Sequence, residues 1–160
     1  LETVAEMSGW DSRTKNVGLG FGVAVGFDAG SYVAQVAKVE VNGRNVSVER
    51  VDVAFDCGKV LNPEGARNQV EGAVVMGMGT TLWESVQFEG GRVINTGFGS
   101  YRVPRITDVP EINVSFVDGL STHPTGAGEP GIVPIAAAIT NAVVDATGLL
   151  IDRLPIQEQL

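Results

Sequence analysis

The dipeptide Asn42-Gly43 lies between two runs of apolar and polar residues, and this arrangement limits the possible folds more than any other feature of the chain. An Asn-Gly pair accepts the positive φ angles of a tight hairpin turn. The run "SYVAQVAKVEV" (31–41) therefore predicts a strand that returns antiparallel through "NVSVERVDVAF" (45–55). In the second run the apolar residues change faces near Glu49-Arg50, which predicts a β-bulge or a change of packing surface there.

The rest of the chain alternates between strand-like and helix-like segments. The expected elements are strands over 19–27 and 111–119, a hairpin over 86–98 that turns at Gly90-Gly91, a helix with Asn62 as N-cap and Pro63 at its first position, and a last helix over 132–146 that stops at Gly148. This order predicts an α+β fold in which helices pack on mixed or antiparallel sheets.

Glycine is unusually frequent, with 21 residues spread through segments that otherwise read as ordered structure. In the helix that follows Asn62, each glycine lowers helix stability by about 1 kcal/mol relative to alanine. That cost is tolerable where another backbone or a bulky ligand comes close to the helix. We therefore expect close backbone approaches along it.

Composition excludes several classes of protein. The net charge of −8 would repel a phosphate backbone, so we expect no nucleic-acid partner. The apolar stretch 131–144 is too short for a membrane span and contains Thr140 and Asn141. One cysteine and one histidine cannot build a cysteine-rich zinc site or ligate an iron–sulfur cluster within this chain. The compartment stays open, with the cytoplasm favoured and the periplasm possible.

The segment "GAGEPG" (126–131) places the carboxylate of Glu129 on a glycine-hinged loop before an apolar helix. Such a loop can direct successive N–H groups toward an anion, with the positive end of the helix dipole behind them. Alternatively, the loop merely starts the helix and Glu129 is an acid in its first turn. Gln69, on the second turn of the earlier helix, offers a donor and an acceptor for a heterocycle or an oxo group. Its alternative role is that of a solvated helix residue.

Together these segments resemble a known enzyme family. The matching stretches are "GSYVAQVAKVEV" (30–41), "VDVAFDCGKVLNPEGARNQVEGAVVMGMG" (51–79), "YRVPRITDVPEI" (101–112), "GAGEPG" (126–131) and "PIAAAITNAVVDATGLLIDRLPI" (134–156). They resemble the C-terminal part of the large, molybdenum-binding subunit of the xanthine dehydrogenase and aldehyde oxidase family, and within it most of all the β-subunit of isoquinoline 1-oxidoreductase. The resemblance implies that residues 1–160 are the C-terminal part of a molybdopterin-binding domain.

The resemblance also implies a chemistry. It implies a molybdopterin cofactor, in bacterial members commonly the cytosine dinucleotide form, whose molybdenum takes no ligand from the protein. Glu129 would be the general base in the hydroxylation of an aldehyde or an aromatic N-heterocycle with oxygen from water. Gln69, Asn68 and the backbone of Gly126, Ala127 and Gly128 would contact the cofactor.

Partners follow from the same resemblance. We expect the remainder of the molybdenum subunit, an iron–sulfur subunit or domain that carries the electrons away, and a small-molecule substrate. The isolated 160-residue fragment is expected to be inactive.

Two other functions stay open. The chain could be a non-catalytic scaffold or interaction domain that keeps the fold, or an acid/base enzyme that uses Glu129 without a metal. Against the metal-free acid/base enzyme, the sequence has no serine nucleophile motif and no second carboxylate beside the loop. Among other candidates, we expect Cys57 to be a buried hydrophobe, His123 a loop residue, Met76 and Met78 packing residues, and Arg102 a partner in a surface ion pair.

Overall fold

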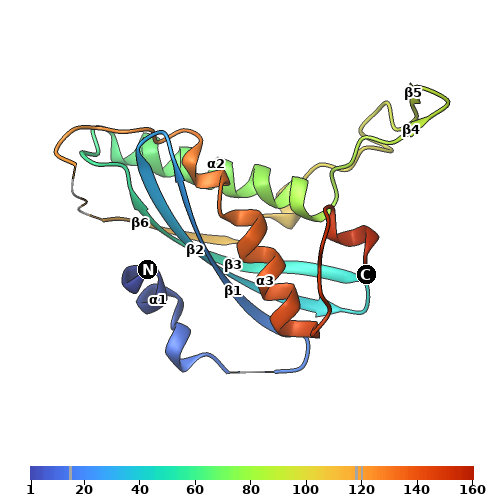
Figure 1. Cartoon of the computed structure of the whole chain (residues 1–160), viewed down its shortest axis with the longest axis horizontal. Helices are drawn as coiled ribbons and strands as arrows, with labels where there is room; N and C mark the ends of the chain where they lie inside the picture. The colour runs from blue at the N-terminus through green and yellow to red at the C-terminus, as the bar shows by residue number, and fades with distance from the viewer. Residues whose placement is uncertain (15, 118, 120) are drawn as a thin grey trace.

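In the computed structural model, residues 1–160 are described except for positions 15, 118 and 120. A four-stranded sheet forms the centre of the molecule, and two long helices lie across it (Figure 1). In chain order the elements are α1 (Glu2–Ser8), β1 (Leu19–Asp28), β2 (Ser31–Asn42), β3 (Asn45–Asp56), α2 (Pro63–Leu82), β4 (Phe88–Glu89), β5 (Arg92–Val93), β6 (Glu111–Phe116) and α3 (Ile135–Thr147), with 3₁₀ turns η1 (Trp10–Ser12), η2 (Ile106–Asp108), η3 (Pro130–Ile132) and η4 (Ile156–Glu158).

The hairpin of β2 and β3 has the predicted turn and the predicted irregularity. The glycine of its turn adopts a φ of 59°, as an Asn-Gly turn requires. Lys38 and Val39 face Arg50 and Val48, so Glu49 is an extra residue on β3. The β-bulge expected near Glu49-Arg50 is therefore confirmed, and it keeps the apolar side chains before and after it, such as Val48 and Val51, on the same face of the sheet.

The strands of the main sheet follow the order β1-β2-β3-β6. The first three pair antiparallel, whereas β6 pairs parallel with β3 and α2 lies in the connection between them. The predicted α+β fold with a mixed sheet is confirmed. The strand expected over 111–119 is confirmed from Glu111 to Phe116, and position 118 of that range lies outside the described residues.

Glycines let α3 lie directly on β1. A Cβ atom added at Gly22 would overlap the carbonyl oxygen of Ala138 and the backbone nitrogen of Ala142. On α2, a Cβ added at Gly77 would lie 2.9 Å from Cγ1 of Ile132 and would overlap the Ile135 side chain. Close approach of another backbone is thus found at Gly22, whereas at Gly77 of α2 the close neighbours are isoleucine side chains.

The two long helices differ in how well the sequence predicted their ends. Asn62 caps α2 as predicted, because its Oδ1 accepts a hydrogen bond of 3.0 Å from the Gly65 N–H. The predicted start of the last helix at residue 132 is wrong, since α3 begins at Ile135. Pro134 has no N–H to continue the helical pattern, and the preceding residues form η3 instead. Gly148 ends α3 with a φ of 73°, as predicted.

The segment Pro130–Thr147 has the length and mean hydropathy, 1.3, of a membrane-crossing helix. Within this chain, however, 44% of the segment is buried. Side chains of α3, such as Ile135 and Ile139, fill the core between the helix and the sheet. The apolar character of α3 is therefore already used in covering the sheet.

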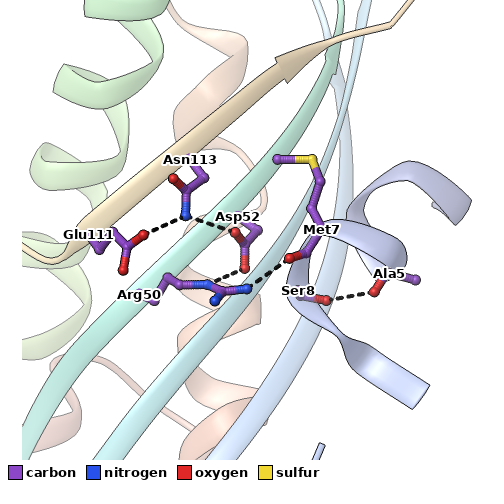
Figure 2. Close-up of polar contacts among 7 residues, drawn as sticks. All are labelled: Ala5, Met7, Ser8, Arg50, Asp52, Glu111 and Asn113. Atoms are coloured by element: carbon purple, nitrogen blue, oxygen red, sulfur yellow. Dashed lines mark hydrogen bonds and ion pairs between the residues drawn. The ribbon is translucent and has the colours of Figure 1, made fainter. Parts of the chain in front are cut away.

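The opposite face of the sheet carries α1, which the sequence did not predict. Val4 of α1 packs with Ala34, Val36 and Ala54 in a small apolar cluster. Figure 2 shows a polar network beside this cluster, in which Arg50 reaches from β3 to the backbone of α1.

A second hairpin, β4–β5, extends away from the sheet (Figure 1). It turns at Gly90-Gly91 as predicted, with φ angles of 55° and 76°. Each strand has only two residues, and all four are exposed. The hairpin strands therefore contribute no buried side chain to the core.

Candidate functional site

The loop that carries Glu129 lies against α2. A Cβ atom added at Gly131 would lie 3.1 Å from Cβ of Ala73 and 3.5 Å from Cα of Val70, so the loop backbone touches the helix. A Cβ added at Gly128 would lie 3.8 Å from Oε1 of Gln69. The structure thus brings together Gln69 and the Glu129 loop, which are far apart in the sequence.

The N-terminal end of this loop is tied to the turn between β1 and β2. The Gly126 N–H donates to the Ala29 carbonyl over 3.0 Å, and Ser31 Oγ donates to the Gly126 carbonyl. Ser31 Oγ also lies 2.8 Å from Thr125 Oγ1, and the Thr125 N–H donates to the Cys57 carbonyl over 2.9 Å. These bonds fix the loop at the ends of three strands.

The C-terminal end of the loop is tied to the middle of β2. Gln35 Nε2 donates a 2.7 Å hydrogen bond to the Gly131 carbonyl, and Gln35 is fully buried. Sequence reasoning missed both Ser31 and Gln35. The sequence does carry one signal for Gln35: it is a polar residue on the same face of an apolar strand as Val33 and Ala37. A polar side chain at such a buried position needs a hydrogen-bond partner.

The backbone groups of the loop are not equally available. Gly126 uses both its N–H and its carbonyl within the chain. The N–H groups of Ala127 and Gly128 donate to no acceptor within the described part of the chain. Of the three backbone contacts expected from the resemblance, these two therefore have a donor to offer a ligand.

Glu129 is exposed, and its side chain has no hydrogen bond or ion pair to another described residue. It is the N-cap residue of η3, but its carboxylate makes no capping bond. Its backbone carbonyl accepts the Ile132 N–H over 2.9 Å. Because α3 starts only at Ile135, Glu129 is not an acid in the first turn of that helix. The carboxylate therefore has no structural role within the described residues.

A hollow of about 340 Å³ opens beside Gln69 and the loop. It lies between the end of β3, the start of α2 and the loop, and its lining includes Cys57, Asn62, Gln69, Thr125 and Ala127. Burial, followed by the nearby carboxylate of Asp56, raises the pKa of the Cys57 thiol. Cys57 is 3% exposed, which confirms the expected buried hydrophobe.

Asn68 and Arg67, the neighbours of Gln69 on α2, have different surroundings. Asn68 is exposed and lines another, larger hollow of about 710 Å³ on the outer side of α2, together with Gly72 and Met76. Arg67 Nη1 donates to the Val114 carbonyl over 2.9 Å. Successive helix residues point about 100° apart, so only Gln69 of the three lines the hollow beside the loop.

The remaining candidates have structural surroundings. Arg102 pairs with Asp108 at 3.2 Å and lies 3.8 Å above the Trp83 ring, which confirms the expected surface ion pair. His123 is an exposed loop residue, as expected. Met78 is a core residue, but the expectation that Met76 also packs is wrong, because it is 64% exposed on the outer side of α2.

No group of three histidine, cysteine, aspartate or glutamate residues lies close enough to hold a metal ion in the described ranges 1–14, 16–117, 119 and 121–160. A cofactor that brings its own metal ligands fits this donor set. It also fits the two unused N–H groups and the hollow beside Gln69.

The sequence matches the molybdopterin cofactor-binding domain over residues 5–110. The chain belongs to this family, whose members include molybdenum hydroxylase subunits.

Two relatives show the similarity along almost the whole chain. A nicotinate dehydrogenase subunit of Pseudomonas putida is 35% identical over 98% of this chain, and the beta subunit of isoquinoline 1-oxidoreductase of Brevundimonas diminuta is 33% identical over all of it. The chain spans only 15% and 21% of the lengths of these relatives.

Solved structures show the same fold. Quinoline 2-oxidoreductase from Pseudomonas putida 86 superposes with a TM-score of 0.75 at 26% identity, over 81% of this chain and 18% of that chain. The aldehyde oxidoreductase from Desulfovibrio gigas superposes with a TM-score of 0.69 at 26% identity, over 79% of this chain and 14% of that chain. The resemblance inferred from the sequence is confirmed.

Proposed function

We propose that this chain is part of the catalytic subunit of a molybdenum hydroxylase that oxidises an aldehyde or an aromatic N-heterocycle with oxygen from water, and that Glu129 is the general base. The observation that carries the proposal is the Glu129 carboxylate itself. It is exposed and unpaired among the described residues, on a loop that hydrogen bonds hold at both ends. A carboxylate with no structural partner in a fixed loop is available for proton transfer.

The neighbouring groups suit a molybdopterin cofactor. Gln69 offers both donor and acceptor groups from the wall of the hollow, and the N–H groups of Ala127 and Gly128 can bind an oxo or phosphate oxygen. We propose that these groups hold the cofactor in its cytosine dinucleotide form, and that the backbone of Gly126, whose N–H and carbonyl are already used within the chain, contacts it without donating a hydrogen bond. Asn68 would contact it only from the outer side of α2.

When bound, the molybdenum cofactor supplies a two-electron acceptor for the substrate. Glu129 would accept the proton released as water-derived oxygen is transferred to the substrate carbon. Gln69 and the loop N–H groups would orient the reacting partners, so that the carboxylate meets the proton at hydrogen-bonding distance. Iron–sulfur centres on a partner subunit or domain would then take the electrons, and the remainder of the molybdenum subunit would complete the walls of the site.

The test is Glu129→Gln in the assembled enzyme that contains this chain. Removing a general base lowers kcat by about 10²- to 10⁴-fold. We expect a loss of this size with molybdenum content unchanged, measured by steady-state turnover and elemental analysis. Glu89→Gln, at an exposed carboxylate on the distant β4–β5 hairpin, is the matched control. If both variants turn over normally, the chain is a non-catalytic scaffold that retains the fold.

A further inference from the structure

Strand β2 holds both ends of the Glu129 loop. Ser31 and Gln35 are four positions apart and therefore point to the same face of the strand, and both are fully buried. Ser31 Oγ donates to the carbonyl of Gly126, and Gln35 Nε2 donates to the carbonyl of Gly131 over 2.7 Å. Glu129 lies between these two attachment points.

The amide of Gln35 is only half satisfied. Its Oε1 is buried and has no hydrogen-bond partner among the described residues. An unpaired buried amide oxygen destabilises a fold, and a methionine would fill a similar volume without that oxygen. Packing volume alone therefore does not explain a glutamine at this position. What glutamine supplies, and methionine does not, is the donor to the Gly131 carbonyl.

We propose that Gln35 is a positioning residue that acts on the reaction through Glu129. The inference rests on the proposed function of Glu129. Gly131 lies two residues after Glu129 in η3, the 3₁₀ turn in which the Glu129 carbonyl accepts the Ile132 N–H over 2.9 Å. Fixing the Gly131 carbonyl from the sheet fixes this turn, and with it the direction in which the Glu129 side chain leaves the loop.

The first test compares Gln35→Met with Thr81→Val in the assembled enzyme. Thr81 is a matched control, since it is also fully buried and donates to a glycine carbonyl, that of Gly77, over 2.6 Å. A displacement of about 1 Å at a reacting group can cost about 10²-fold in rate. For Gln35→Met we therefore expect kcat to fall by about 10- to 100-fold, with KM and molybdenum content within about twofold of the parent. Thr81→Val should leave kcat unchanged.

The second test separates positioning from a general structural effect. If Gln35 acts through Glu129, then Gln35→Met should cause no further loss of kcat in an enzyme that already carries Glu129→Gln. A merely structural role would lower kcat by the same factor in both backgrounds. That additive result would overturn the proposal.

The third test does not depend on activity. The N–H groups of Ile132 and Val133 donate to the carbonyls of Glu129 and Pro130 over 2.9 and 3.2 Å. When Gln35 no longer holds the turn, we expect hydrogen–deuterium exchange at these two amides to become at least about tenfold faster, and to stay unchanged in Thr81→Val.

The exchange result distinguishes the failure of this inference from that of the proposed function. Unchanged exchange in Gln35→Met would overturn the positioning role even if Glu129→Gln abolishes turnover. The other outcome is faster exchange in Gln35→Met together with unchanged turnover in Glu129→Gln. That result would refute the proposed function, and with it any role of Gln35 in the reaction.

Discussion

The two faces of the central sheet are held in different ways. The face that carries α2, α3 and the Glu129 loop is held by apolar side chains such as Phe55 and Ile139, and by glycines that allow direct backbone contact. The face that carries α1 has a small apolar cluster and a charged network. In this network Arg50 Nε donates to Asp52 Oδ2 over 2.8 Å, and Arg50 Nη2 donates to the Met7 carbonyl over 2.9 Å.

This difference predicts which kind of substitution destabilises each face. Close-packed backbones tolerate no added volume, whereas a charged network depends on each of its partners. The face that holds the candidate site should therefore respond most to changes of volume, and the α1 face to the removal of a charge. Three substitutions test this comparison.

The largest effect is expected for Gly22→Val on the site face. Its Cβ would overlap the carbonyl oxygen of Ala138 and the nitrogen of Ala142, and neither backbone atom can move without displacing α3. We expect the free energy of unfolding to fall by more than about 3 kcal/mol, measured by denaturant titration. Gly97→Val is the control, because a Cβ at Gly97 meets nothing within 4 Å. Similar stabilities of the two variants would show that α3 is not packed directly on β1.

An intermediate effect is expected for Arg50→Met on the α1 face. Asp52 is 3% exposed, so the substitution leaves a buried carboxylate without its cation and the Met7 carbonyl without its donor. Removing one partner of a buried pair costs about 3–5 kcal/mol, but the Arg50 side chain is 32% exposed, so we expect a loss of about 1–3 kcal/mol.

Arg102→Met is the matched control for this prediction. The pair of Arg102 with Asp108 is more exposed, and its loss should cost less than about 1 kcal/mol. Urea unfolding of both variants measures the difference. Equal losses would mean that burial does not distinguish the two ion pairs, and the contrast between the two faces would fail.

Local features of the fold were predictable, and long-range ones were not. The Asn42-Gly43 turn, the bulge at Glu49 and the Asn62 cap each depend on residues a few positions apart. The parallel pairing of β6 with β3 joins segments that are distant in the chain, and no short-range pattern specifies it. The seven-residue α1 was missed because it has no side-chain N-cap, and a helix this short depends on its packing on the sheet.

The candidate site divides in the same way. Glu129 and Gln69 stand in recognisable segments, so the order of residues alone is enough to nominate them. Ser31 and Gln35 could be noticed only as polar residues in an apolar strand. The carbonyl that each one binds is 95 or 96 positions away, and tertiary packing alone decides that pairing.

The smallest effect is expected for Gly72→Ala, which sharpens the comparison within a single helix. A Cβ at Gly72 meets nothing within 4 Å, so alanine should raise the free energy of unfolding by up to about 1 kcal/mol through its helix propensity. Gly77→Ala, further along α2, should do the opposite, because its Cβ would overlap Ile135 of α3. Thermal unfolding of the two variants measures both signs. If Gly72→Ala also destabilises this chain, then α2 is closely packed on its outer side as well, and the volume-sensitive contacts are not confined to the face that holds Glu129.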